Sequence, residues 1–163
     1  MKILITYASN NKTTEICANM LKERLPEADI VNLSEQKPNV SLYDIIIIGS
    51  CVRFNCIHED VKNFIGDNID ELMKKKTAIY LCCAFSEKAN QYLLHNFPKK
   101  LLNKSFSIQC FGGRLKVKPY NLYDKFIMRT VVKNFKLDNR SFPDIDLKSI
   151  SKMVDDITLA IEK

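Results

Sequence analysis

Four consecutive isoleucines at positions 45–48 constrain the fold of this chain more than any other feature of its sequence. Successive side chains of a β-strand point to opposite faces of a sheet, so an unbroken isoleucine run is buried on both faces. A strand covered on both faces is typical of a parallel sheet with helices on each side. We therefore predict a strand over 43–49 in the interior of an α/β sheet.

The other apolar segments alternate between strand and helix patterns along the chain. Predicted strands cover 2–7, 29–33, 43–49, 77–84 and 107–112, and predicted helices cover 13–24, 58–74, 90–102 and 145–163. Parallel neighbours need crossover connections, so we expect a doubly wound five-stranded parallel sheet with helices on both faces. We expect the whole chain, 1–163, to form a single domain, to which 114–140 is an addition.

Composition and charge narrow the range of partners. The 46% hydrophobic and 27% charged content excludes a disordered or fibrous chain. A net charge of +6 favours anionic partners, although we find no nucleic-acid-binding motif and expect no nucleic acid. Because no apolar run approaches the roughly 20 residues of a membrane-spanning helix, and the N-terminus resembles a strand rather than a signal peptide, a cytoplasmic location is expected.

The six cysteines favour neither a disulfide framework nor a metal site. No C-x-x-C spacing occurs, and thiols of a cytoplasmic protein are normally reduced. Three are expected to be small core residues and three to lie at strand ends or in loops, namely Cys17, Cys82 and Cys110 in the first group and Cys51, Cys56 and Cys83 in the second. No metal site is predicted.

Ligands of a doubly wound sheet bind beyond the carboxyl ends of the strands, where the winding direction reverses. The loops that follow Tyr7, Gly49 and Cys83 are therefore the candidate binding loops. The first, A-S-N-N-K-T-T over 8–14, leads into a helix whose N-terminal N–H groups attract anions. The same loop also fits an ordinary helix cap formed by Asn11 or Thr13.

Glycine is absent from this loop, which excludes both the G-x-G-x-x-G dinucleotide motif and the P-loop of nucleoside triphosphate enzymes. Two or more phosphates need close approach of the backbone, whereas a single terminal phosphate can be held by side-chain hydroxyls and amides. The loop therefore favours a mononucleotide.

The segment Y-A-S-N-N-K-T-T resembles the phosphate loop of flavodoxins, with Ser9 and Thr14 at its hydroxyl positions. Lys12 stands where flavodoxins usually carry Gly or another small residue. The resemblance implies FMN as the cofactor and a strand order of 2-1-3-4-5. The implied phosphate-binding residues are Ser9, Asn10, Asn11, Lys12, Thr13 and Thr14.

The other two loops are implied by the same resemblance to flank the flavin ring. Phe54 is expected to stack on the ring, and Arg53 to stabilise anionic reduced flavin or to bind an acidic substrate. The implied ring-binding residues are Ser50, Cys51, Val52, Arg53, Phe54 and Asn55 in one loop and Cys83, Ala84, Phe85 and Ser86 in the other.

Two alternatives concern the first of these loops and the helix after it. His58 could act near the flavin, although a structural role at the start of a helix is the preferred reading. Cys51 and Cys56 could form a redox pair, but they lack the C-x-x-C spacing of thiol oxidoreductases.

Two longer segments, G-S-C-V-R-F-N-C-I-H and F-G-G-R-L-K-V-K-P-Y-N-L-Y-D-K-F-I-M-R, resemble the menaquinone-dependent protoporphyrinogen dehydrogenase group of flavodoxin-like proteins. This implies an FMN-dependent oxidoreductase that passes electrons to a quinone or a partner protein. That group carries a long loop after the fourth strand, whereas 85–96 here is shorter and predicted to be mostly helical. Alternatives are a flavodoxin-type electron carrier that supplies a reductase and a binding module that has lost its flavin. No catalytic residue is identified.

The segment 116–136 combines basic and apolar residues at helical spacing. Such a helix can lie on an anionic membrane surface, where quinones are within reach. The commoner arrangement packs the apolar face on the body of the protein. A third use is docking of an acidic redox partner.

Overall fold

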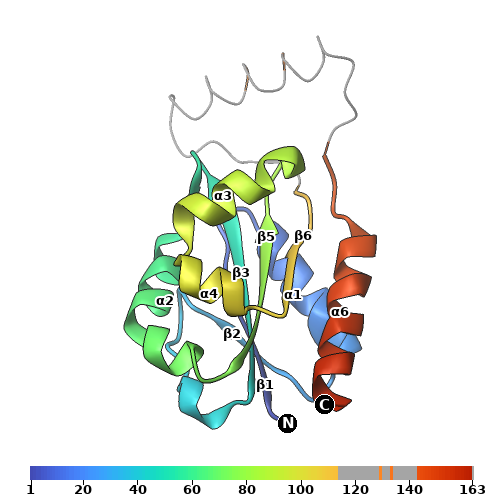
Figure 1. Ribbon diagram of the computed structural model, residues 1–163. Helices are drawn as coiled ribbons and strands as arrows, with labels where there is room; N and C mark the ends of the chain where they lie inside the picture. Colours follow the sequence, from blue (N-terminus) through green and yellow to red (C-terminus); the bar gives the residue numbers. More distant parts are fainter. Residues whose placement is uncertain (114–128, 130–132, 134–142, 163) are drawn as a thin grey trace.

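The computed structural model describes residues 1–113, 129, 133 and 143–162, and its centre is a parallel sheet (Figure 1). The strands run in the order β2-β1-β3-β5-β6. Their bounds are β1 (Ile3–Ala8), β2 (Asp29–Asn32), β3 (Ile45–Arg53), β5 (Lys76–Cys82) and β6 (Ser107–Cys110). This confirms the predicted order 2-1-3-4-5 of the parallel strands and the doubly wound fold class.

Helices cover both faces of this sheet. In Figure 1, α1 (Thr13–Arg24) and α6 (Leu147–Glu162) lie on one side, and α2 (Glu59–Leu72), α3 (Ala89–Asn96) and α4 (Lys99–Lys104) on the other. Short 3₁₀ helices, η1 (Val40–Leu42) and η2 (Ser86–Lys88), precede β3 and α3. The helix predicted over 13–24 has the same bounds in the structure.

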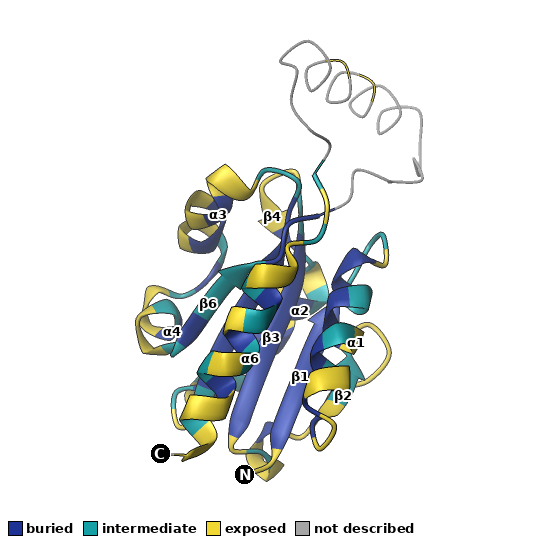
Figure 2. Cartoon of the chain, turned by 90° about the vertical axis from the view of Figure 1, so that its right-hand side faces the viewer, coloured by how far each residue is buried: buried dark blue, intermediate teal, exposed yellow. Residues whose placement is uncertain are grey.

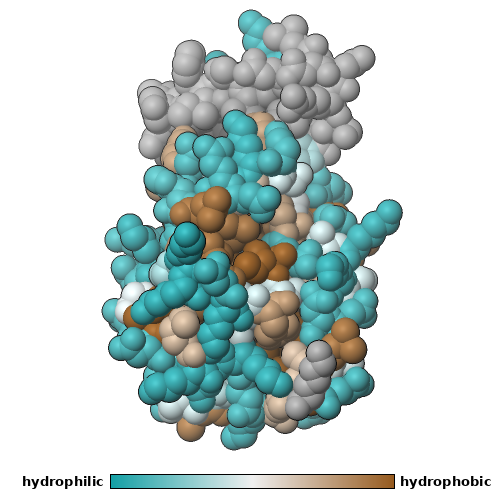
Figure 3. Space-filling view, viewed as in Figure 1, coloured by the Kyte–Doolittle hydropathy of each residue, from teal (hydrophilic) through white to brown (hydrophobic). Residues whose placement is uncertain are grey.

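The isoleucine run confirms the two-sided burial that its sequence predicts. All four side chains are fully buried, and they alternate between the two core clusters, Ile46 and Ile48 facing α2 and Ile45 and Ile47 facing α1 and α6. Figure 2 shows β1 and β3 as a buried layer between helices whose outer faces are exposed, with the outer strand β6 only half-buried. The face in Figure 3 is largely polar, with apolar atoms gathered in the region of α3, which carries the exposed Leu94.

The third predicted strand is longer than expected. We predicted a loop from Ser50 onward, but β3 continues to Arg53 and pairs antiparallel with a two-residue strand, β4 (Cys56–Ile57). Phe54 and Asn55 form the turn between them, with φ of 50° and 65°. A two-residue turn with both central residues left-handed matches the twist of a hairpin, and the usual sequence signal is glycine. The hairpin was missed because Phe-Asn lacks that signal.

The single helix predicted over 90–102 is wrong, since the structure divides this segment into α3 and α4. Phe97 between them has an extended backbone, with φ −107° and ψ 145°. The residue before a proline is pushed out of the helical region by the proline ring, so Pro98 ends α3 and starts a new helix.

Tyr80, in the middle of β5, joins the sheet to the first helix. It is fully buried, stacks on Phe111 with ring centroids 4.6 Å apart, and donates its hydroxyl to the carbonyl of Thr14 at 3.3 Å. Gly49 on β3 leaves the space for this ring, because a Cβ there would lie 2.0 Å from the ring of Tyr80. The first turn of α1 is thus fixed by a side chain from a central strand.

Beyond β6 the chain is described continuously as far as Gly113 and again from residue 143, with only residues 129 and 133 described between them. Gly112 has a left-handed backbone, with φ 70°, and forms a bridge with Ile145. The predicted basic helix over 116–136 lies outside the described residues except for Arg129 and Lys133, which are exposed. None of the described helices is long and apolar enough to cross a membrane.

Candidate functional site

The three candidate loops start from one edge of the sheet. Ala8 at the end of β1 pairs with Ser50 on β3, and Cys51 pairs with Cys82 at the end of β5. The loops after β1 and β3 also touch, because Asn10 Nδ2 donates to Cys51 Sγ at 3.5 Å. The strand order reverses between β1 and β3, which is where a doubly wound sheet binds its ligand.

Two hydroxyls of the first loop are buried without a hydrogen-bond partner among the described residues, Ser9 Oγ and Thr14 Oγ1. Thr14 is fully buried, and its side chain lies beside the thiol of Cys82, whose pKa is raised by burial and lowered in part by Thr14. Leaving a buried polar group unpaired costs about 1–3 kcal/mol, so such groups need an explanation. An anion at the N-terminus of α1 would give both hydroxyls an acceptor.

Lys12 is the residue that turns the chain into α1. It has a left-handed backbone, with φ 66°, and its side chain makes no capping hydrogen bond. Left-handed backbone favours glycine, which accounts for the small residue that flavodoxins usually carry there. Of the two residues considered as caps, Asn11 accepts from the backbone N–H of Thr13 at 3.3 Å, so it closes the turn before the helix.

The loop after β3 has a buried and an exposed part. Ser50 is fully buried, and its hydroxyl donates to the Cys51 carbonyl at 3.0 Å and accepts from the N–H of His58 at 3.0 Å. Its side chain therefore holds the hairpin together. Phe54 at the tip is 56% exposed, with the Arg53 guanidinium 5.2 Å from the centre of its ring.

A bulky residue at positive φ is energetically unfavourable, and such strain often accompanies a functional site. The aromatic side chain that the sequence singles out is thus held in solvent by a strained backbone.

Asn96, at the end of α3, holds this hairpin in place and was not singled out by sequence. Its Nδ2 donates to the Asn55 carbonyl at 2.8 Å, and its Oδ1 accepts from the N–H of Ile57 at 3.2 Å. No sequence signal could have found it, because it lies inside the segment predicted as one continuous helix.

His58 caps α2. Its Nδ1 accepts from the N–H of Asp60 at 3.3 Å, and the same nitrogen lies 3.4 Å from the Asp60 carboxylate. This is the structural position at a helix start that the sequence favoured for it.

One cysteine departs from its predicted placement: Cys110 is half-buried rather than a core residue. Cys17 and Cys82 are core residues as predicted, and Cys51 and Cys83 lie at the ends of β3 and β5 as predicted, where both are buried. Burial raises the pKa of Cys51, whereas Cys56 is exposed on β4. Among the described residues no three metal-binding side chains gather.

The loop after β5 begins with Cys83, whose Sγ lies 3.3 Å from Cys110 Sγ. Ala84 and Phe85 follow as half-buried residues, and Ser86 is exposed at the start of η2. The Lys88 ammonium lies 5.6 Å from the centre of the Phe85 ring. This loop is therefore short and carries one aromatic side chain. It follows the strand that neighbours the hairpin.

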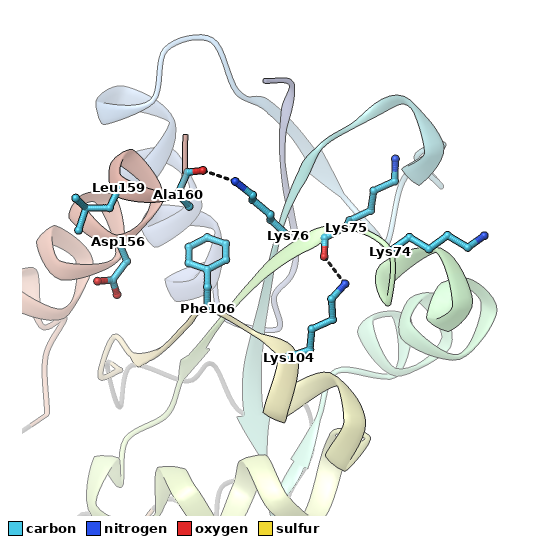
Figure 4. A pocket seen from close by; sticks show the side chains of 8 residues that line it. All are labelled: Lys74, Lys75, Lys76, Lys104, Phe106, Asp156, Leu159 and Ala160. Atoms are coloured by element: carbon cyan, nitrogen blue, oxygen red, sulfur yellow. Dashed lines mark hydrogen bonds between the residues drawn. The ribbon is translucent and has the colours of Figure 1, made fainter. Parts of the chain in front are cut away.

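A hollow of about 460 Å³ lies at the opposite edge of the sheet (Figure 4). It is lined by several lysines, of which Lys76 begins β5. Lys76 Nζ donates to the Ala160 carbonyl at 2.5 Å, and Lys104 Nζ donates to the Lys75 carbonyl at 2.7 Å. These lysines donate hydrogen bonds to carbonyl groups near the ends of helices. None of the residues lining the hollow belongs to the predicted binding loops, so the hollow is not the site that the sequence predicts.

Comparison with known proteins agrees with this geometry. The chain is 25% identical over 144 residues to protoporphyrinogen IX dehydrogenase [quinone] of Escherichia coli K12, covering 82% of this chain and 80% of that protein.

Solved structures share the fold. Flavodoxin 1 of Bacillus cereus has a TM-score of 0.51 at 20% identity, over 83% of this chain and 98% of its own. The FMN complex of a flavoprotein from Lactobacillus acidophilus has a TM-score of 0.51 at 14% identity, over 69% of this chain and 91% of its own. The rubredoxin oxygen:oxidoreductase of Desulfovibrio gigas has a TM-score of 0.54 at 16% identity, over 94% of this chain and 36% of its own.

The sequence model of the flavodoxin domain matches residues 4–141, which include all three candidate loops. Its match extends over most of the chain, from the first strand to beyond the last strand of the sheet. The chain belongs to the flavodoxin domain family.

Proposed function

We propose that this protein binds FMN at the edge formed by the loops after β1, β3 and β5, and that it works as a redox protein. The observation that carries the proposal is the pair of buried hydroxyls of Ser9 and Thr14, just before and within the first turn of α1, which have no hydrogen-bond partner in the described part of the chain. One phosphate group can accept hydrogen bonds from both and from the N-terminus of a helix. Residues 9–14 would hold that phosphate, and the positive charge of Lys12 would favour it.

The other two loops would enclose the flavin ring. Residues 50–55 present Phe54 as an exposed, rigidly held aromatic for stacking, and residues 83–86 bring Phe85 from the neighbouring strand. Bound FMN would supply the electron-transfer chemistry, and the chain would position it and adjust its charge environment. Arg53, beside the Phe54 ring, is the residue placed to stabilise negative charge there.

We further propose that the electrons come from a porphyrinogen and go to a quinone, as in the relative whose name states that activity. An electron carrier without its own substrate is the second candidate. The loop between β5 and α3 is short and contains only the 3₁₀ turn Ser86–Lys88. Because it offers little chain to enclose a large substrate, it favours the carrier.

The FMN site is tested by comparing FMN with riboflavin, which has the same ring and no phosphate. Wild-type protein should retain FMN through desalting, with its visible absorption bands, and bind riboflavin more weakly. In S9A/T14V, the preference for FMN over riboflavin should become much smaller. A control, S151A/T158A, removes hydroxyls of the same kinds from α6, where both already have hydrogen-bond partners, and should keep the preference. Equal binding of both flavins by wild-type protein contradicts the phosphate site.

The reaction is tested with the FMN-loaded protein and menadione as quinone. Oxidation of protoporphyrinogen that depends on the protein supports the enzyme. Rapid electron exchange with a partner reductase, without porphyrinogen oxidation, supports the carrier.

We also propose a cytoplasmic protein that contacts anionic membrane through residues 116–136, where a quinone would be within reach. Flotation with vesicles containing phosphatidylglycerol, compared with phosphatidylcholine vesicles, tests this. Equal binding to both contradicts the proposal, and retention by an acidic redox protein instead would assign the segment to a protein partner.

A further inference from the structure

Two cysteine sulfurs meet at the edge of the sheet, where sequence analysis foresaw no pair. Cys83 Sγ and Cys110 Sγ are 3.3 Å apart, and both cysteines are free thiols. A disulfide bond is about 2.05 Å long, so the two sulfurs need to approach by little more than about 1 Å.

The backbone already brings these two residues together. The N–H of Phe111 donates to the Leu81 carbonyl at 2.8 Å, which fixes β6 against β5 next to both cysteines. The chain after β6 also packs on Cys83, because a Cβ on Gly113 would lie 3.0 Å from the Cys83 carbonyl carbon. The ends of β5 and β6 that carry the two cysteines are therefore held side by side.

The neighbouring cysteine in the sequence faces the other way. Cys83 and Cys110 pack with the core cluster under α2, α3 and α4, whereas Cys82 packs with Cys17 in the cluster under α1 and α6. Because successive residues of a strand point to opposite faces, Cys82 cannot replace Cys83 in the contact with Cys110.

The two thiols have unequal chemical properties. The hydrogen bond with Cys83, supported by the backbone N–H groups of Gly112 and Cys83, lowers the pKa of Cys110 to about 7 against the opposing effect of burial. The same contact and burial raise the pKa of Cys83. Cys110 is half-buried and Cys83 is 4% exposed, so the more acidic thiol is also the more accessible one. This is the division into attacking and resolving thiol that disulfide exchange uses.

We propose that Cys83 and Cys110 form a reversible disulfide when the protein meets a low-molecular-weight disulfide, with Cys110 as the attacking and Cys83 as the resolving thiol. The Cys110 thiolate attacks one sulfur of the small disulfide, whose S–S bond breaks, and a mixed disulfide forms as the first small thiolate leaves. Cys83 then gives its proton to water and attacks Cys110 Sγ, and the second small thiolate leaves. The two cysteines lose two electrons, and the small disulfide is reduced to two thiols. The bond would tie the loop after β5 to the end of β6.

The experiment uses flavin-free protein with oxidised glutathione, so that it does not depend on the proposed FMN site. Trypsin cleaves after Lys and Arg, which places Cys83 in peptide 77–88 together with Cys82, and Cys110 in peptide 105–114, so fragmentation of the joined peptides must locate the link at Cys83. Wild-type protein should yield these two peptides joined, and they should separate after reduction. A link between 77–88 and the Cys17 peptide, 13–22, would overturn the proposal, as would unlinked peptides from folded protein.

Variants assign the two roles. C83S should stop at the mixed disulfide and accumulate glutathione on peptide 105–114, whereas C110S should form no link and leave peptide 77–88 unmodified. C56S, which removes an exposed cysteine, is the matched control and should form the link as wild type does. A C83S protein that never carries glutathione on Cys110 contradicts the assignment.

A measurement on wild-type protein keeps the inference testable even if a variant fails to fold. The rate at which iodoacetamide modifies Cys110 should rise with pH through a midpoint of about 7, because the thiolate is the reactive form. A midpoint at the ordinary value of about 8.5 would contradict the role of Cys110 as the attacking thiol.

Discussion

The polar groups at the two edges of the sheet differ in whether their hydrogen bonds are satisfied. At the carboxyl edge, the hydroxyls of Ser9 and Thr14 are buried without partners among the residues that the structure describes, and Lys12 and Phe54 have left-handed backbones. At the amino edge, the hollow of Figure 4 is large and charged, but Lys104 is hydrogen-bonded to carbonyl groups at the end of α2. The two edges therefore differ in the hydrogen-bonding capacity that they offer a ligand, and each edge predicts a different response to mutation.

Removing the two hydroxyls of the carboxyl edge has the largest expected effect, and that effect is on binding. S9A/T14V should weaken FMN binding by at least about 100-fold, since two hydrogen bonds to a charged group together contribute about 3–6 kcal/mol. Its free energy of unfolding without flavin should stay unchanged or rise, because buried polar groups without partners are lost. Fluorescence titration and urea unfolding measure the two quantities. Loss of stability equal to the loss of affinity would show that the hydroxyls are structural.

The amino edge should show the reverse pattern. Lys104→Met keeps the length of the side chain but removes the ammonium that bonds the carbonyls of Leu72, Met73 and Lys75. We expect a loss of about 1.5 kcal/mol in the free energy of unfolding, at the low end for charged hydrogen bonds because the residue is exposed. FMN affinity should not change. A change in affinity without a change in stability would mean that the hollow takes part in binding.

Asp146 is a polar residue at the carboxyl edge whose carboxylate already has hydrogen-bond partners within the protein. It caps α6, accepting from the N–H of Lys148 at 3.0 Å and from the Ser149 hydroxyl at 2.8 Å. Asp146→Ala should lower the free energy of unfolding by about 1 kcal/mol and leave FMN affinity unchanged.

The pH dependence of this cap can be checked in the same variant. The Ser149 hydroxyl and the first N–H groups of α6 hold the pKa of Asp146 below its ordinary value. A lowered folded-state pKa means that the carboxylate stabilises the fold above its unfolded pKa, about 3.9, and that this contribution disappears as pH falls through the folded pKa. The difference between wild type and Asp146→Ala in urea unfolding should therefore be full at neutral pH and shrink under strong acid. A constant difference would show that charge plays no part in the cap.

The smallest expected effect is the gain in stability when backbone strain at the hairpin tip is relieved. Phe54→Gly should raise the free energy of unfolding by about 0.5 kcal/mol, since glycine adopts positive φ at no steric cost. FMN affinity should fall nonetheless, because the stacking ring is lost. Asn55→Gly relieves the same kind of strain without removing the ring and should retain affinity. If Phe54→Gly lowers stability, the ring packs on the protein in the absence of flavin.

The sequence allowed the sheet, and the edge at which the three candidate loops meet, to be predicted, because both follow from simple periodicity. Ile45 to Ile48 required a strand with two covered faces, and the order of strands then determined where the loops would meet. The hairpin at Phe54 could not be predicted, since its turn uses residues that rarely adopt positive φ. The break at Pro98 was a missed signal, because a proline within a helical pattern indicates a boundary.

Contacts between distant positions were beyond sequence reasoning. The 3.3 Å approach of Cys83 and Cys110 depends on the register of β5 and β6, which no local pattern specifies. Asn96 holds the hairpin from a helix 41 positions away from Asn55, and only the folded chain brings them together. Without a spacing motif, neither pair has a signature in a single sequence.

The ring of Tyr80 occupies the space beside Gly49 so fully that the two positions can change only together. Any side chain at Gly49 requires a smaller residue at position 80, and a smaller residue there removes the hydroxyl that holds the carbonyl of Thr14. Among homologues we therefore expect these two positions to covary. Where the glycine is replaced, the first turn of α1 should be anchored by some other hydrogen-bond donor.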